Sequence, residues 1–375
     1  MVSKCFKHFE TIIQIIMKHL AVLISMCILC VSCVKKEKKE QINVPLDTKV
    51  IKVDLANEYK GVKFPKTNNF MRVLRLEDND EHPIGQVSKV IADNKKIYLL
   101  DKLKANALFV YSQEGLLLHV IDKKGQGPGE FSRPDDFDVE KKTGNIIIMD
   151  ASQKKFIVYS PKGEFIREFK YDFFASKFSL NQETHILADN GNIPSPDSDF
   201  LLKEMDINGN YLKSFFPSDP STLGMSFETR YPLQQFGDYM FFLPTLSNSI
   251  YALKGEESSL AYQIDFGNAW PSKEFCESVQ NIHPLKMRES MLEKGYVCFL
   301  NFLQTKDVLQ LDFHKDKNYS FYYNKETGKS ILISMDDDSI SLPLGTYDDK
   351  FITVKYNENT GAVTVIFYTV NFDLI

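Results

Sequence analysis

The chain has 375 residues, of which 43% are apolar and 25% are charged, and its formal net charge is −5. This composition is that of a globular protein with room for one large domain or two smaller ones, and the acidic balance excludes nucleic acid as a partner class. The 29 phenylalanines and 17 tyrosines, together with runs rich in Ile and Val, favour strands over helices.

The first predicted element is a bacterial lipoprotein signal over residues 1–33. The run MKHLAVLISMCILCVSC, which begins at Met17, has a basic start, an apolar stretch and the small residue Ser32 before Cys33. A transmembrane anchor is the alternative, but the apolar stretch is shorter than the roughly 20 residues that span a bilayer. We therefore predict cleavage before Cys33 and lipidation of that cysteine, with Met17 as a second candidate start. The expected location is the cell envelope, on the periplasmic side or at the cell surface, with the lipid as the sole contact with the membrane.

Residues 34–64 are predicted to form a tether and an extended lead-in. The tether begins with VKKEKKEQ, which is too highly charged to pack and is typical of a solvated spacer. Residues 65–375 then form the folded domain.

One register recurs along residues 65–375: an apolar run, a polar turn, a second apolar run, a glycine and a third run. IYLLDKLKANALFVYSQEG and IIIMDASQKKFIVYSPKGE align almost without gaps. The recurring glycines are Gly115, Gly163, Gly209, Gly255 and Gly328. The second run closes at Tyr111, Tyr159, Met205, Tyr251, Tyr323 and Tyr368. The usual spacing is about 46 residues, the length of a four-stranded propeller blade, so we predict an all-β, six-bladed β-propeller with four-stranded blades.

The sixth copy runs out of chain after its third strand. The segment FMRVLRLE, at residues 70–77, lies ahead of the first copy and is predicted to supply the missing outer strand. A ring closed in this way leaves no sheet edge exposed.

The stretch KKGQGPGEFSRPDD, residues 123–136, contains three glycines at alternate positions. A nucleotide-binding loop would need a helix directly after it, with its N-terminal amides facing the phosphate. Pro134 and the following aspartates lead into a strand instead. We predict a tight turn between the outer strand of blade one and the inner strand of blade two, in which glycine permits positive φ.

In a propeller, the outer-to-inner connections lie on the same face as the turns between second and third strands. Asp101, Asp150 and Asp189 end the predicted second strands, where they either cap the backbone of the turn or contact a ligand. Loops on a rigid ring are where binding residues vary freely. The predicted ligand-face residues are Gln126, Glu130, Arg133, Asp101 and Asp150.

A longer insertion precedes the fifth copy, with one or two short helices predicted over residues 271–295. Ser272 is the expected N-cap and Gly295 the expected C-cap. Phe275, Val279 and Ile282 are expected to pack on the propeller. After cleavage the remaining cysteines are Cys33, Cys276 and Cys298. Because Cys33 carries lipid, we predict a Cys276–Cys298 disulfide, with two buried thiols as the alternative.

The sequence has no GxSxG, HExxH or paired-cysteine motif. His119 and His185 lie in predicted strands and are interpreted as structural. Asp138 and Glu140 are the acids of the inner strands, but they do not recur as a metal-ligating set. The acidic segments MDDDS and DNDEHP lack calcium-loop spacing. No cofactor, metal site or catalytic residue is predicted.

Along the chain an apolar strand is followed by an aspartate, a turn, FVYSQEG and then KGQGPGEF. This order resembles that of the six-bladed β-propeller lipoproteins of Bacteroidetes-type bacteria, and more loosely that of the NHL-like propellers. The resemblance covers roughly residues 65–375 and implies a fold and an envelope location. From the missing catalytic constellation we expect a non-catalytic binding or scaffold module for a glycan, peptide or protein partner. A lyase or lactonase with a metal in the central channel is the alternative.

Overall fold

The computed structural model describes residues 48–58, 68–182, 184–225, 227, 229–280, 282–334 and 342–372. All of these belong to one compact unit, Val44–Ile375. The predicted signal with Cys33, the charged start of the tether and the MDDDS segment lie outside the described residues. No helix in the described part of the chain is long and apolar enough to cross a membrane.

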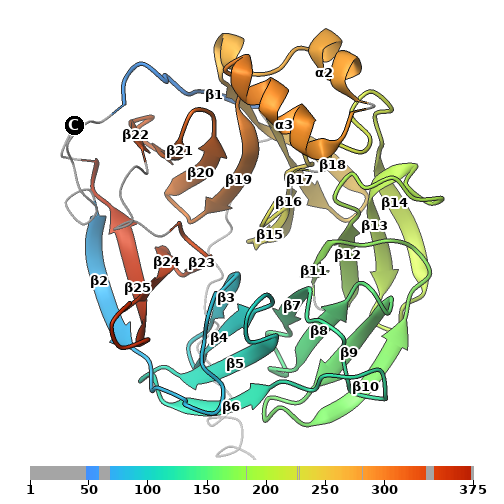
Figure 1. Ribbon diagram of the computed structural model, residues 1–375, viewed down its shortest axis with the longest axis vertical. Coiled ribbons are helices and arrows are strands. Elements are labelled where there is room, and N and C mark those ends of the chain that lie inside the picture. The colour runs from blue at the N-terminus through green and yellow to red at the C-terminus, as the bar shows by residue number, and fades with distance from the viewer. Residues whose placement is uncertain are drawn as a thin grey trace, which may run out of the picture. The chain divides into compact units, whose positions relative to one another are not determined.

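Six antiparallel sheets succeed one another around a central axis (Figure 1), and each is called a blade here. Blade one contains β3 (Lys89–Ala92), β4 (Lys96–Asp101), β5 (Ala107–Ser112) and β6 (Leu117–Ile121). Blade two contains β7 (Asp136–Val139), β8 (Ile146–Asp150), β9 (Lys155–Tyr159) and β10 (Phe165–Lys170). Blade three contains β11 (Lys177–Asn181), β12 (His185–Asp189), β13 (Phe200–Asp206) and β14 (Tyr211–Pro217).

Blade four contains β15 (Leu233–Phe236), β16 (Tyr239–Phe242), β17 (Ser249–Lys254) and β18 (Glu257–Asp265). Blade five contains β19 (Cys298–Gln304), β20 (Val308–His314), β21 (Asn318–Asn324) and β22 (Ser330–Ser334). Blade six contains β23 (Gly345–Tyr347), β24 (Lys350–Tyr356), β25 (Val363–Val370) and β2 (Asn68–Arg75). The six-bladed, four-stranded architecture predicted from the repeat is therefore confirmed.

The N-terminal strand β2 closes the ring. It pairs antiparallel with β25, with Val73 opposite Ile366 and Leu74 opposite Val365. It thereby supplies the outer strand that the sixth sequence copy lacks. The closing strand predicted over residues 70–77 is confirmed, with bounds two residues earlier.

Blade four carries a fifth strand that the sequence analysis did not assign. β1 (Lys49–Lys52) pairs in parallel with β18 at its outer edge. Ile51 and Val53 are buried in the apolar cluster shared by blades four and five. The predicted lead-in therefore contains an ordered strand, which covers one otherwise open edge.

The recurring glycine marks a close contact between neighbouring blades in the first three copies, whereas a Cβ on Gly255 would have no described neighbour within 4 Å. Gly115, Gly163 and Gly209 all have φ between 81° and 90°. A Cβ on Gly115 would lie 2.6 Å from the Arg75 carbonyl oxygen at the end of the preceding outer strand, and one on Gly209 would lie 2.6 Å from that of Lys170. Glycine is required there both by the backbone conformation and by the approach of the adjacent blade.

The hydrophobic core is divided into layers between blades. Leu100 of blade one packs with Phe137 and Ile148 of blade two, and Phe109 of blade one packs with Phe367 of blade six. These side chains are almost fully buried, and each contributes about 1.5–3 kcal/mol relative to an exposed position. Every blade is therefore stabilised mainly by its two neighbours, which makes the closing strand essential.

Side chains also connect the inner strands around the axis. Lys89 of β3 makes an ion pair of 2.9 Å with Asp136 of β7. Asp136 and Asp138 in turn accept hydrogen bonds from the backbone amides of Phe178 and Leu180 in β11. The inner-strand acid Asp138 is thus committed to holding blades two and three together.

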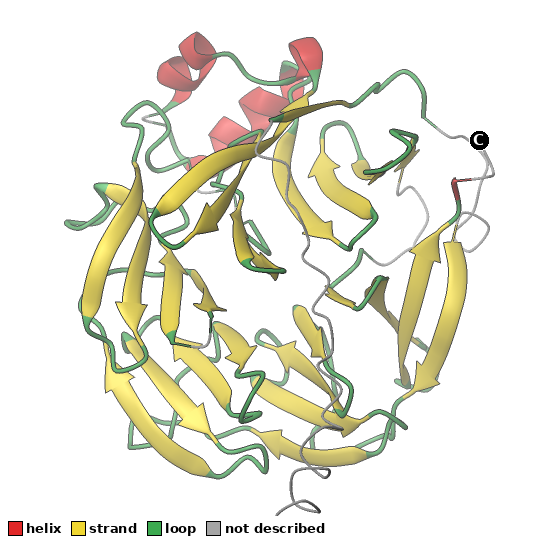
Figure 2. Ribbon diagram, turned by 180° about the vertical axis from the view of Figure 1, so that it is seen from behind, coloured by secondary structure: helices red, strands yellow, loops and turns green. Residues whose placement is uncertain are grey.

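The insertion between β18 and β19 contains a 3-10 turn (Gly267–Ala269), α2 (Lys273–Val279) and α3 (Pro284–Glu293). Figure 2 shows these helices, in red, gathered at one edge of the ring. Ser272 accepts a hydrogen bond of 3.2 Å from the Phe275 amide, and Gly295 follows α3 with φ 72°, as predicted. The expected packing of Ile282 is wrong: it lies beyond the end of α2 and is 37% exposed.

Phe275 and Val279 do pack in an apolar cluster, which α2 shares with α3, β19 and the connection between blades three and four. Cys276 and Cys298 are both buried in this cluster as free thiols. The disulfide between them stays a prediction.

Candidate functional site

The glycine-rich loop between blades one and two is a closed turn. The Gly125 amide donates to the Phe131 carbonyl at 2.9 Å. The Gly127 amide donates to the Glu130 carboxylate at 2.9 Å, and the Gly129 amide donates to Glu168 at 3.0 Å. All three glycine amides are therefore occupied by the protein itself, which confirms the turn and leaves no cradle for a phosphate.

Asp101 and Asp150 lie at the ends of β4 and β8 with fully buried side chains. Asp101 accepts the amides of Gly85, Gln86 and Lys104 at 2.7 to 2.8 Å. Each of the two carboxylates thus joins the turn between the second and third strands of its blade to the connection that leads into the inner strand of that blade.

Asp150 accepts the Ser132 amide at 2.6 Å and the Gln153 amide at 3.0 Å. Burial raises the pKa of Asp150, but these hydrogen bonds outweigh burial, so its net pKa is lowered.

The other three predicted ligand-face residues surround the same loop. Glu130 is half-buried and its carboxylate holds the Gly127 amide. Arg133 is exposed and pairs with Asp135 at 2.6 Å. Gln126 is exposed. The structure therefore brings all five residues to the same end of the strands, with Gln126 and Arg133 open to solvent.

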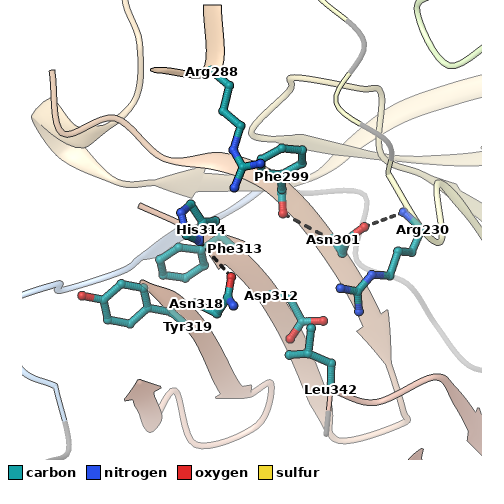
Figure 3. Close-up of a pocket in the computed structure, with 10 residues that line it drawn as sticks. All are labelled: Arg230, Arg288, Phe299, Asn301, Asp312, Phe313, His314, Asn318, Tyr319 and Leu342. Carbon is teal, nitrogen blue, oxygen red and sulfur yellow. Dashed lines mark hydrogen bonds between the residues drawn. The ribbon is translucent and has the colours of Figure 1, made fainter. Parts of the chain in front are cut away.

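A pocket of about 210 Å³ opens at that same end of the strands, in blade five (Figure 3). It lies where β19 begins, where β20 ends and where β21 begins. The connection before β15, the connection before β23 and helix α3 complete its wall. The lining residues are Arg230, Arg288, Phe299, Asn301, Asp312, Phe313, His314, Asn318, Tyr319 and Leu342.

A β-bulge shapes the wall formed by β19. Cys298 lies opposite His314 and Asn301 lies opposite Asp312, so the pairing shifts between them. Phe299, inside this bulge, has φ 58°. Holding a bulky residue in the left-handed region costs of the order of 1–3 kcal/mol, and such residues are concentrated at functional sites. Bulges often redirect side chains at these sites.

Asp312 is the acid at the base of the pocket and is 4% exposed. Its Oδ1 accepts hydrogen bonds from the Gln310 amide group and, at 3.2 Å, from the Ser320 hydroxyl. Burial raises the pKa of Asp312 to about 6, although Arg230 opposes this rise. No described residue donates a hydrogen bond to its Oδ2.

Two arginines line the pocket together with this acid, and neither forms an ion pair with it. Arg230 points its guanidinium toward Asp312 (Figure 3), and its backbone amide donates to Asn301 at 2.6 Å. Arg288, from α3, lies over the Phe299 ring with its guanidinium carbon 4.9 Å from the ring centre. The buried Nε of Arg288 has no hydrogen-bond partner within the described part of the chain. Neither guanidinium has an ion-pair partner among those same residues.

No three His, Cys, Asp or Glu side chains of the described residues are grouped so as to hold a metal ion. His185 pairs with Glu204 at 2.9 Å within blade three. Burial lowers the pKa of His119 to about 4. Both histidines belong to blade packing and lie outside the pocket.

The predicted ligand-face residues lie at the same end of the strands as the pocket, but none of them lines it. Arg230, Arg288 and Asp312 belong to three separate segments and form no motif. One signal was available: in VLQLDFH, Gln310 and Asp312 interrupt an otherwise apolar second strand. A polar pair at a buried position indicates a site or a hydrogen-bond network.

A family model described as 6-bladed beta-propeller, DUF5128, matches residues 38–356. No curated protein matches the chain.

Among solved structures, a candidate exported protein from Bacteroides fragilis NCTC 9343 is 18% identical, with a TM-score of 0.71 over 87% of this chain and 100% of that chain. A member of the DUF4221 family from Bacteroides vulgatus is 9% identical, with a TM-score of 0.56 over 81% and 98%. At these identities the likeness concerns the fold alone.

Proposed function

The chain belongs to the DUF5128 family of six-bladed β-propellers, and from this premise we propose that it is a non-catalytic binding module of the cell envelope. In this proposal a lipid on Cys33 anchors the chain, and the blade-five pocket binds a glycan, peptide or protein ligand. The predicted ligand face around Gln126 and Arg133 lies at the same end of the ring, outside the pocket, and would make only weaker contacts with ligands that extend beyond the pocket.

The observation that carries the proposal is the charge arrangement in the pocket. A buried acid with a raised pKa lines the same pocket as two arginines that have no ion-pair partner among the described residues. Structural charges in proteins are normally paired when buried. Strongly perturbed acids in a concave pocket are therefore candidates for a functional site.

Rigidity also supports binding. The pocket residues of blade five stand on strands, and Arg288 stands on a helix held by the buried residues Met287 and Met291. Side chains on such elements are positioned more accurately than side chains on free loops.

The test uses purified full-length protein in detergent, screened against glycan and peptide libraries, with Arg288→Gln and Arg133→Gln as matched variants. We expect Arg288→Gln to reduce binding at least tenfold and Arg133→Gln to change it less than threefold. The reverse pattern would place the ligand on the glycine-loop face and refute the pocket. Conversion of a bound ligand, detected by mass spectrometry, would favour the lyase or lactonase alternative over a binding module.

A further inference from the structure

The pocket offers two different kinds of contact to a ligand, one on each side. The side formed by Arg288 presents a cationic guanidinium. The Asp312 side presents a buried acceptor. Both kinds of contact have to be satisfied by a single ligand of small size.

On the first side, Arg288 is held ready for an oxyanion. Its guanidinium rests on Phe299, and its Nε is buried without a partner among the described residues. A guanidinium presents a planar fork that matches carboxylate and sulfate oxygens. His314 lies beside the same Phe299 ring, and its Nδ1 donates to Asn318 Oδ1 at 2.8 Å, so its Nε2 is left to accept a hydrogen bond from a ligand hydroxyl.

On the second side, Asp312 requires a hydrogen-bond donor. Gln310 and Ser320 occupy Oδ1, while Oδ2 accepts no hydrogen bond from the described residues. A second anion placed against this carboxylate would be repelled. The Arg230 guanidinium, which points toward Asp312 (Figure 3), offsets part of this charge but makes no ion pair with it. The ligand group at Oδ2 is therefore a hydroxyl or an N–H, and the oxyanion of the ligand lies toward Arg288.

The volume restricts what can carry both groups. At about 210 Å³ the pocket is smaller than the roughly 300–1,000 Å³ typical for drug-sized ligands. A single hydroxylated ring places donors and an oxyanion within this space. A peptide would have to bring an acidic side chain and a backbone N–H into it together, which needs more room.

On this basis, and resting on the proposed function, we propose that the blade-five pocket recognises an acidic sugar residue, with Arg288 at its carboxylate or sulfate and with Asp312 and His314 Nε2 at ring hydroxyls. A site built to bind a particular polar group rejects the analogue that lacks it. The neutral sugar is therefore bound much more weakly than the acidic one.

The experiment measures binding of single sugars to full-length protein by calorimetry at pH 7. The probes are glucuronic acid, glucose 6-sulfate, glucose and the dipeptide Gly-Glu. We expect one or both acidic sugars to bind at least tenfold more tightly than glucose. Comparing glucuronic acid with glucose 6-sulfate shows whether the oxyanion that the pocket binds is a carboxylate or a sulfate.

Two variants and a control connect binding to the geometry. Arg288→Gln is expected to remove the preference for the acidic sugar, and Asp312→Asn to weaken both acidic and neutral sugars. Arg75→Gln, which changes an arginine whose side chain is 68% exposed on the outer strand, is the control and should change neither. Melting temperatures no lower than that of the wild type would show that the variants fold.

The outcomes separate this inference from the proposed function. Two results would refute the acidic-sugar class: equal binding of glucose and the acidic sugars, or binding of Gly-Glu alone. If Asp312→Asn abolishes the binding observed, the pocket remains a binding site. Binding of these probes that no pocket variant alters would refute the pocket and both proposals together.

Discussion

Replacing Asp312 by Asn should stabilise the protein at neutral pH, because the wild-type carboxylate is charged in a buried place. Burial raises its pKa from the ordinary 3.8 to about 6. The folded state therefore binds more protons than the unfolded state between these values, and the free energy of unfolding falls as pH rises through this window. At 1.36 kcal/mol per pKa unit, the full loss is about 3 kcal/mol above pH 6.

Asparagine removes the charge and keeps an oxygen that can accept from Gln310 and Ser320. We expect Asp312→Asn to raise the free energy of unfolding by up to about 3 kcal/mol at pH 7.5, and to leave it nearly unchanged at pH 4. The assay is urea unfolding followed by the fluorescence of the single tryptophan, Trp270, which stacks on Phe266. Comparing the two proteins at each pH cancels the titration of all other groups.

Asp150→Asn is the matched control with the opposite sign. Its net pKa is lowered by the hydrogen bonds that it accepts, so its charge is stabilising at neutral pH. An amide there should cost about 1–3 kcal/mol through unmatched donors. A buried, destabilising charge on Asp312 is refuted if the Asp312→Asn protein is no more stable than wild type at pH 7.5. It is also refuted if the gain in the free energy of unfolding is the same at pH 7.5 and at pH 4.

Four further outcomes test the anchor, the ring and the insertion. Cys33→Ala protein should lose incorporation of a radiolabelled lipid precursor; retained label would contradict anchoring there. Deleting residues 68–75 should abolish the single cooperative unfolding transition, and a deletion variant that melts like the intact chain would show that β2 does not close the ring. Gly209→Ala should lower stability by about 1–3 kcal/mol, since it adds a Cβ at 2.6 Å from the Lys170 carbonyl oxygen; wild-type stability would argue against that contact. Protein isolated from the envelope should show the Cys276–Cys298 disulfide by non-reducing peptide mapping, and two alkylated thiols would exclude it.

The blade count could be predicted from sequence because its signals are local. Each blade repeats the same alternation of apolar runs and turns, and glycine recurs where the chain touches the previous blade, as at Gly115 and Gly209. The closing strand followed from counting, since the sixth copy lacked an outer strand. The β1 strand was missed because the four residues KVIK are short, half polar and surrounded by charged sequence.

The pocket could not be predicted in the same way, because it depends on contacts between distant segments. Arg230 and Arg288 come from two different outer-to-inner connections and look like ordinary surface residues in the sequence. They line one pocket with Asp312 only after blades four and five pack. The aspartates that do repeat in sequence, such as Asp101, turned out to have their carboxylates committed to backbone amides.

The arrangement also indicates why the helical insertion precedes blade five. Blade five supplies Asp312 and Asn301 from strands whose positions are set by the ring, and neither strand could place a cation over the Phe299 ring. Helix α3, fixed by Met287 and Met291 in the cluster beneath it, carries Arg288 to that position. Local rules are broken here three times within one pocket: a positive φ at an aromatic residue, a buried acid with a raised pKa and a guanidinium nitrogen buried without a described partner. Natural sequences concentrate such exceptions at functional sites, and in the proposed function the insertion is the part that completes the binding site on an otherwise repetitive scaffold.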